Sequence, residues 1–435
     1  MNRIFYNLVS KPIHIAPLIS FRILFGLLTF FSTTRFINRG WVAQLFIEPE
    51  FYFSFFDFIK PLPEQTTYYL FYLMAIASLA IAFGFLYRLF IIIYFIIFTY
   101  FELLDKSNYL NHYYFISLVS FVLIFLPANR ALSIDNLIFK RKNVTHISAY
   151  NINILMLMLG IVYFFAGVAK INSDWLLEAL PLKIWLQAKY NYPIIGNLLT
   201  QKATAYFFSW AGCLFDLSIF FLLINKKTRI FGYFALITFH LLTSWLFPIG
   251  VFPFIMISLT TVFFSENTHQ KIQDFLLRSD WKTIQKNIYQ PAHQKFVITF
   301  LIIFVIIQLL LPFRYLLYKG NLFWHEQGFR FSWRVMLIEK VGYASFYIKS
   351  DGKEIVAVDN QKYLTRTQIK MLNTQPDMMV QYAQFLQKKY TQLGFKNPKV
   401  YAEVYISLNG KGSKLFNHTN IDLSLQKIIG NKKIG

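Results

Sequence analysis

Residues 151–170 read NINILMLMLGIVYFFAGVAK, a stretch that carries no charge until its last residue. About 20 apolar residues are long enough for a helix to cross the hydrocarbon core of a bilayer. Comparable apolar segments recur along the chain, near 17–35, 66–86, 89–104, 112–127, 151–170, 204–224, 229–247, 249–264 and 296–313. The sequence therefore predicts a polytopic α-helical membrane protein with about nine transmembrane helices.

The composition of the 435 residues agrees with a membrane protein. Hydrophobic residues make up 56% and charged residues 15%, whereas soluble domains carry about 25% charged residues. The hydrophobicity excludes a disordered chain. The single cysteine, Cys213, excludes a disulfide within the chain.

The net charge of +22 is not a sign of nucleic-acid binding. The basic residues of the apolar part lie mostly in short loops, where they set topology and meet anionic lipid. No nucleic-acid-binding motif accompanies them. We therefore expect a lipid bilayer as a partner and no nucleic acid.

The distribution of basic residues predicts the orientation. With a cytoplasmic N-terminus, the inner loops hold 15 Lys and Arg residues and the outer connections hold 8. This asymmetry favours the N-terminus inside. An odd number of spans then places the tail, including residue 435, on the outer face. Segments 41–58 and 175–190 are aromatic but interrupted by charge, so we expect them to be interfacial or re-entrant.

The chain is predicted to divide into a transmembrane helical domain, 1–312, which carries the catalytic site, and an extracytoplasmic α+β or β-rich domain, 313–435. Residues 344–349 and 400–408 alternate apolar and polar side chains as strands do. Asn409-Gly410 is a hairpin-turn signal. A helix in one or two pieces is predicted over 367–393.

Familiar catalytic motifs are absent from the sequence. It contains no GxxxxGK[ST], GxGxxG, HExxH or GxSxG pattern. The eight histidines do not lie at metal-ligand spacing from one another, so we predict no metal site. Ionisable residues near the apolar segments are more informative, because charge in hydrocarbon is costly. The predicted topology brings Lys170, His112, His240 and the tail to one end of the bundle.

Each of these residues has a structural alternative. Lys170 could snorkel to the interface at a helix end. His112 could cap its helix or bond a tyrosine, and His240 could be a packing residue. Three further charged residues could form structural ion pairs or hold the bundle together: Arg22, Arg88 and Asp216. The functional interpretation is that Lys170, shielded from water, loses its preference for the charged form and becomes a usable base.

Several ordered runs of residues carry a resemblance to a known family. They are FRILFG at 21–26, IKPLP at 59–63, LDKSNYLNHYY at 104–114, PANR at 127–130, YFFAGVAKINSDW at 163–175, LFDL at 214–217, FH at 239–240, FPIG at 247–250 and FRFSWRVM at 329–336. The chain resembles the vitamin K-dependent γ-glutamyl carboxylases and their bacterial relatives, which share a horizontally transferred transmembrane domain.

The resemblance implies roles for particular residues. It implies that Lys170 is the base that acts on reduced vitamin K and that His112 supports the reaction centre. His240 is implied to lie near the active region. Further candidates for binding substrate or cofactor are Asn111, Asp174 and Trp175.

The resemblance also implies a reaction and its partners. Oxygenation of a vitamin K hydroquinone, or of menaquinol, yields a strong base that removes a γ-proton from a glutamate side chain. The carbanion captures CO2, and the quinone leaves as its epoxide, with O2 as co-substrate. A glutamate-containing peptide or protein is the expected partner, and the bacterial inner membrane the expected location, with the C-terminal domain periplasmic.

Two other hypotheses remain open. One is a membrane enzyme that oxygenates quinols without carboxylating a protein. The other is a non-catalytic quinone-binding module or a transporter. A transporter would be expected to show inverted repeats and paired broken helices, which the sequence does not display.

Overall fold

A computed structural model describes residues 6–426. Seven of its helices are long and apolar enough to cross a membrane: α2 (Ala16–Asn38), α4 (Glu64–Phe83), α5 (Tyr87–Leu104), α8 (Tyr150–Ala169), α12 (Lys202–Ile224), α13 (Arg229–Leu246) and α16 (Gln294–Leu310) with its continuation η4 (Leu311–Leu317). The predicted polytopic helical fold is therefore confirmed.

The other two predicted spans are shorter apolar helices. They are α6 (Asn111–Phe125) and α14 (Phe252–Leu259), which continues as η3 (Thr260–Phe263). The 15 residues of α6 rise about 22 Å, less than the roughly 30 Å of hydrocarbon in a bilayer. Both therefore need protein neighbours over part of the membrane depth.

The helices pack closely at glycines, which have no side chain to keep the two backbones apart. A Cβ on Gly26 of α2 would lie 2.5 Å from the backbone nitrogen of Ala82 in α4. A Cβ on Gly167 of α8 would lie 2.8 Å from Leu217 Cγ in α12. Small residues at such crossings let helix backbones approach, as is common in membrane bundles.

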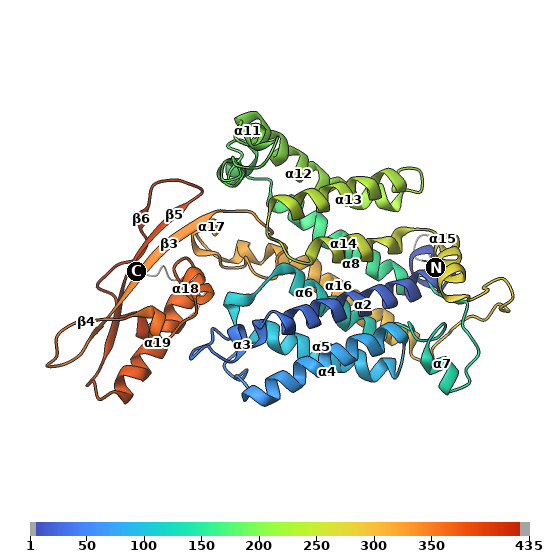
Figure 1. Cartoon of the computed structure of the whole chain (residues 1–435), viewed down its shortest axis with the longest axis horizontal. Helices are drawn as coiled ribbons and strands as arrows, with labels where there is room; N and C mark the ends of the chain where they lie inside the picture. Colours follow the sequence, from blue (N-terminus) through green and yellow to red (C-terminus); the bar gives the residue numbers. More distant parts are fainter. Residues whose placement is uncertain (1–5, 427–435) are drawn as a thin grey trace.

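The two ends of the bundle differ (Figure 1). At one end, β1 (Pro12–His14) pairs with β2 (His146–Ser148), and α15 (Glu266–Leu277) contacts α2. The described start of the chain and the loops 128–150 and 265–295 therefore meet at this end, and the C-terminal region lies at the opposite end. The predicted topology groups these segments in the same way. Which membrane face each end occupies remains a prediction, and Arg3 and residue 435 lie outside the described residues.

Arg22 does not form the ion pair considered for it. Its guanidinium donates hydrogen bonds to the carbonyl oxygens of Ala128 at 2.7 Å and Leu132 at 2.6 Å. No carboxylate forms a salt bridge with it in the described part of the chain. Backbone carbonyls therefore accept most of the hydrogen bonds that this buried guanidinium can donate. The same bonds tie α2 to the loop after α6.

The C-terminal region contains a sheet in the order β4 (Val356–Ala357), β3 (Lys340–Lys349), β5 (Lys399–Leu408), β6 (Lys414–Leu415). Its long central strands, β3 and β5, are antiparallel, with Tyr343 opposite Tyr405. These strands contain the two predicted ones. The predicted helix forms in two pieces, α18 (Arg366–Leu372) and α19 (Pro376–Gln392). The predicted division between residues 312 and 313 remains a prediction.

The interrupted aromatic segments form short elements. Segment 41–58 contains α3 (Trp41–Phe46) followed by irregular chain, and its Phe53 is fully buried in the core of the C-terminal region. The remaining elements are η1 (Tyr6–Ser10), η2 (Lys106–Asn108), α7 (Ile134–Ile138), α9 (Ser173–Leu176), α10 (Leu182–Gln187), α11 (Gly196–Leu199), α17 (Leu322–His325), η5 (Asn360–Lys362) and η6 (Leu423–Leu425).

Candidate active site

A cavity of about 460 Å³, here called the main cavity, lies among α8, α12, α13 and the start of α14. Its walls are mostly aromatic and aliphatic, and the C-terminal part of the chain contributes Val335 and Met336. Four groups able to exchange a proton line it: Tyr163, Lys170, Asp216 and His240. A largely apolar pocket with a few convergent polar groups is the usual form of a small-molecule site.

Lys170 and Asp216 form a buried ion pair at this cavity. Lys170 Nζ lies 2.7 Å from Asp216 Oδ2, and the two side chains are 9% and 5% exposed. Nζ also donates to the carbonyl oxygen of Ala166 at 3.2 Å and lies 5.3 Å from the ring centroid of Trp175. The lysine therefore turns inward at the helix end, in contrast to a side chain that snorkels to the interface.

Local features of the sequence bring this pair together. Gly167 allows α12 to approach α8, which places Asp216 opposite Lys170. Directly after the lysine, Asn172 caps α9 by accepting a hydrogen bond from the backbone N–H of Trp175 at 2.9 Å. The indole N–H of Trp175 donates to the carbonyl of Ser209 in α12 at 2.9 Å. The tryptophan is thus fixed over the ammonium group.

His240 and Tyr163 form a second polar pair in the cavity wall. The Tyr163 hydroxyl lies 2.7 Å from His240 Nε2. The other ring nitrogen, Nδ1, is buried without a hydrogen-bond partner among the described residues. This pair accounts for only one of the two ring nitrogens, so His240 retains an unused donor or acceptor beside the cavity.

His112 does not line the main cavity. It lines a smaller neighbouring cavity between α2, α5 and α6. Its ring centroid lies 5.3 Å from that of Phe252, and Phe252 in turn lies 5.8 Å from His240. The two predicted histidines are therefore brought close together, but one phenylalanine ring stands between them.

Asn111 and Asp174 contact the C-terminal part of the chain. Asn111 Nδ2 donates to the carbonyl of Arg334 at 3.2 Å. The Asp174 carboxylate accepts hydrogen bonds from Asn409 at 2.8 Å and from Lys411 at 3.0 Å. Neither residue lines the main cavity. Their positions suit holding the C-terminal region against the cavity more than contacting a ligand in it.

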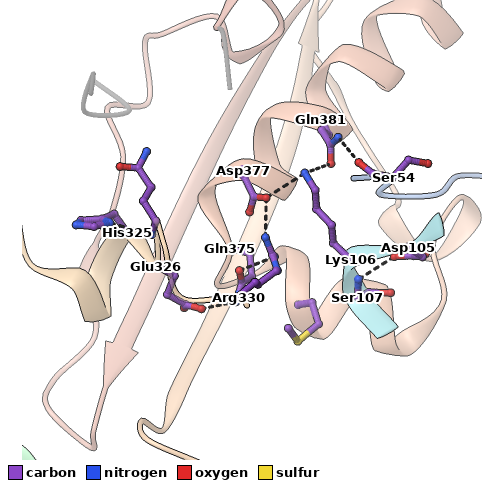
Figure 2. Close-up of polar contacts among 12 residues, drawn as sticks. Ser54, Asp105, Lys106, Ser107, His325, Glu326, Arg330, Gln375, Asp377 and Gln381 are labelled. Atoms are coloured by element: carbon purple, nitrogen blue, oxygen red, sulfur yellow. Dashed lines mark hydrogen bonds and ion pairs between the residues drawn. The ribbon is translucent and has the colours of Figure 1, made fainter. Parts of the chain in front are cut away.

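A polar network fixes the loop before His112 to the C-terminal region (Figure 2). Asp377 of α19 accepts hydrogen bonds from Arg330 at 2.8 Å and Lys106 at 3.1 Å. Gln381 also accepts from Lys106, at 3.0 Å. Burial opposes ionisation of Asp377, but Arg330 and Lys106 outweigh burial and hold the pKa of this carboxyl well below its usual value.

A second branch of this network involves Asp105, which accepts a hydrogen bond from Gln368 of α18 at 2.7 Å. Here burial dominates and raises the pKa of the Asp105 carboxyl, and no cation among the described residues forms a salt bridge with it to compensate. The loop that leads into α6 is therefore anchored to the C-terminal region at two successive residues, Asp105 and Lys106.

The sequence reasoning missed several residues of the site. Asp216 was considered only as a structural ion-pair member, and Tyr163, Phe252 and Met336 were not singled out as lining residues. A carboxylate within the apolar helix α12 was the available signal for Asp216. No comparable signal marks Phe252 among 50 phenylalanines. Among residues 6–426, no group of three or more His, Cys, Asp or Glu side chains is placed to hold a metal.

Two models of known families together match almost the whole chain. Residues 10–267 match the model of the HTTM domain. Residues 293–432 match the model of the vitamin K-dependent gamma-carboxylase, lumenal domain. No solved structure matches the chain. The two matches follow one another along the chain, and the residues of the main cavity come from both.

Proposed function

The chain belongs to the vitamin K-dependent gamma-carboxylase family, and we propose that it is a membrane enzyme that couples oxygenation of a vitamin K-type hydroquinone to carboxylation of peptidyl glutamate. The observation that carries this proposal is the Lys170–Asp216 pair in the wall of the main cavity. A base and its partner, held away from water, suit proton abstraction from a weakly acidic hydroxyl.

The residues of the main cavity fit a quinol head group. Aromatic walls such as Phe215, Phe239 and Phe252 offer faces for stacking. His240 offers a hydrogen bond to a ring oxygen, because its Nδ1 has no other partner in the described part of the chain and its Nε2 is held by the Tyr163 hydroxyl. When bound, the hydroquinone supplies the reducing equivalents and the strong base that the carboxylation needs.

The contribution of Lys170 is to accept a proton. The 2.7 Å between Lys170 Nζ and Asp216 Oδ2 is short enough for a proton to pass from the ammonium to the carboxylate. The resulting neutral amine can take the proton of a hydroxyl, and Asp216 keeps the ammonium in place afterwards. The apolar walls exclude the water that would otherwise quench a strong base or a carbanion.

The position of the cavity suits substrates of different polarity. Its walls include residues of membrane-spanning helices, so a lipid-soluble quinol can enter sideways from the bilayer. Val335 and Met336 border the same cavity and lead into β3. A polar glutamyl peptide would approach from that end, which we propose is the extracytoplasmic side of a bacterial inner membrane.

One assay with two readouts tests the proposal. The purified protein is supplied with reduced vitamin K, labelled bicarbonate and a glutamate-rich peptide, and label incorporation and quinone epoxide are measured together. Both signals are the expected result. Epoxide without label would indicate a quinol-oxygenating enzyme that does not carboxylate protein. The absence of both, in protein that binds the quinone and is correctly folded, would overturn the enzymatic proposal.

A further inference from the structure

A smaller cavity of about 60 Å³, here called the side cavity, lies beside the main cavity. Its wall includes Thr29 of α2, Glu102 of α5, Asn108 of η2, His112 of α6 and Val251. A volume of this size holds roughly four water molecules. It is too small for a quinone, and it has the size of a site for water.

Three polar groups of this wall have unmet hydrogen-bonding capacity. Glu102 Oε1 and Asn108 Nδ2 are buried and have no partner among the described residues. His112 makes no hydrogen bond through its ring nitrogens to any described residue. An acceptor, a donor and an imidazole therefore border one cavity, which is the arrangement that retains buried water.

Glu102 has only one satisfied carboxyl oxygen. Its residue is 6% exposed, and Oε2 accepts a hydrogen bond from the Ser117 hydroxyl at 2.5 Å. No cation forms a salt bridge with it in the described part of the chain. A buried carboxylate without a cation is costly, so this group must either bind water through Oε1 or carry a proton.

The side cavity adjoins the site already described through a single ring. Phe252 borders the main cavity and contacts both His112 and His240. Of the residues that line the side cavity, those that titrate are Tyr94, Glu102, His112 and Tyr113. The lining residues from α2 and α14 carry no charge, so Glu102 is the acidic group of the lining. Outside the lining, Tyr109 and Tyr114 also lie near enough to Glu102 to feel its charge.

We propose that the side cavity is a hydrated proton-exchange site in which Glu102, through water held with Asn108, sets the protonation and orientation of His112. In the exchange, an N–H bond of the imidazolium breaks, one proton moves along the water, and an O–H bond forms on the Glu102 carboxylate. The imidazolium becomes neutral as the carboxylate becomes a carboxylic acid, so charge is conserved. Glu102 acts through His112 and is a positioning residue.

This inference rests on the proposed function only in assuming that the reaction uses the proton exchanged between His112 and Glu102. The link between Glu102 and His112 can be measured without any activity. Nitrogen-15 histidine is incorporated into the full chain in bilayers, and its ring signals are followed against pH by solid-state NMR. His112→Gln identifies the signal of His112.

If water links the Glu102 carboxylate to His112 as proposed, the carboxylate favours imidazolium, and removing it should make His112 lose its proton at lower pH. We expect Glu102→Gln to lower the titration midpoint of His112 by about one pH unit. Asn108→Ala, which removes only the donor that holds the water, should shift the midpoint in the same direction by less. Glu64→Gln removes an exposed carboxylate of α4 and should leave the midpoint unchanged.

An unchanged midpoint in a folded Glu102→Gln protein would overturn the inference. Glutamine keeps the shape of glutamate and an oxygen that can accept from Ser117, so we expect the Glu102→Gln protein to fold. If it does not fold, the titration midpoint of His112 in Asn108→Ala tests the inference instead. If the wild type shows neither epoxide nor carboxylation but Glu102→Gln still shifts His112, the proposed function fails while the proton-exchange site stands. If the wild type is active and His112 does not respond, only the inference fails.

Discussion

The lysine that ends α8 has one carboxylate partner, Asp216, from a helix 46 positions further along the chain. Interpreted alone, a lysine at a helix end is usually an interfacial anchor. The pairing distance of 2.7 Å and the low exposure of both side chains favour a different role, because a buried pair costs desolvation energy that an anchor does not need.

Replacing Lys170 separates these roles. If Lys170 is the base, Lys170→Ala should lower quinol epoxidation and carboxylation together by about 100-fold or more, the range for losing a general base. Lys170→Arg should not rescue either activity, because a guanidinium stays protonated at any accessible pH. Both activities are measured at matched expression and thermal stability.

The anchor hypothesis predicts the opposite for Lys170→Arg, because arginine snorkels as well as lysine. Full activity in that variant would remove Lys170 from the mechanism. A small exogenous amine that restores part of the activity of Lys170→Ala would support the role as a base.

Asp377 tests the polar network outside the membrane-spanning segments. Arg330 and Lys106 hold the pKa of its carboxyl below the usual value, although burial opposes them. A lowered pKa means that the charged form stabilises the fold above the ordinary carboxyl pKa and that this contribution is lost as the pH falls through the lowered value. Asp377→Asn should therefore cost about 2 kcal/mol at neutral pH, since its partners are left partly buried and unpaired.

The stability difference between wild type and Asp377→Asn should shrink as the pH falls below about 4. Thermal unfolding in detergent across this pH range measures it. Asp57→Asn, a change at an exposed carboxylate, is the control and should show little difference at any pH. A constant gap between wild type and Asp377→Asn down to pH 3 would contradict the assignment.

At the scale of elements, the close approach of α2 and α4 depends on the absence of one side chain. A Cβ on Gly26 would lie 2.5 Å from Ala82 N and 2.6 Å from Ser78 O, both backbone atoms that cannot move aside easily. Gly26→Ala should therefore destabilise the protein by about 1–3 kcal/mol through overpacking. The readout is the thermal midpoint in detergent.

Gly212 provides a matched control for Gly26. It also lies within a spanning helix, α12, but an added Cβ meets nothing within 4 Å. Gly212→Ala should leave stability unchanged or raise it by up to about 1 kcal/mol, because alanine favours helix over glycine. Equal effects of the two substitutions would show that the α2–α4 crossing is not as tight as described.

For the whole molecule, the arrangement of the two ends leads to a topology prediction. Reporter fusions in the loops 128–150 and 265–295 should be active on the cytoplasmic side, and a fusion at residue 435 on the outer side. The reasons are the 15-to-8 distribution of basic residues and the odd number of apolar segments. The control is a fusion in segment 41–58, which should report the same side as residue 435.

A cytoplasmic reporter signal at residue 435 would overturn this orientation. The grouping of segments at each end, which comes from contacts such as β1 with β2, would remain. The glutamyl peptide substrate would then have to approach from the cytoplasmic face, because the main cavity borders on the C-terminal region, which would lie on that face.

Much of the fold follows from local patterns. Long apolar segments predict membrane helices because backbone groups in lipid must be satisfied within a helix. Alternation over 344–349 and 400–408 predicts β3 and β5, and Asn409-Gly410 predicts the turn, which has positive φ at both residues. The lengths of α6 and α14 were less predictable, because apolar character continues beyond their helical residues.

The sequence by itself determined the class of protein, the family and the candidate residues Lys170, His112 and His240, because these depend on composition and on short runs of residues. Only the tertiary structure decided their partners. It pairs Lys170 with Asp216 and Asp174 with Lys411 in salt bridges. It also places the Phe252 ring between His112 and His240. Such contacts join residues far apart in the chain, and they depend on helix crossings and domain docking that no local pattern encodes.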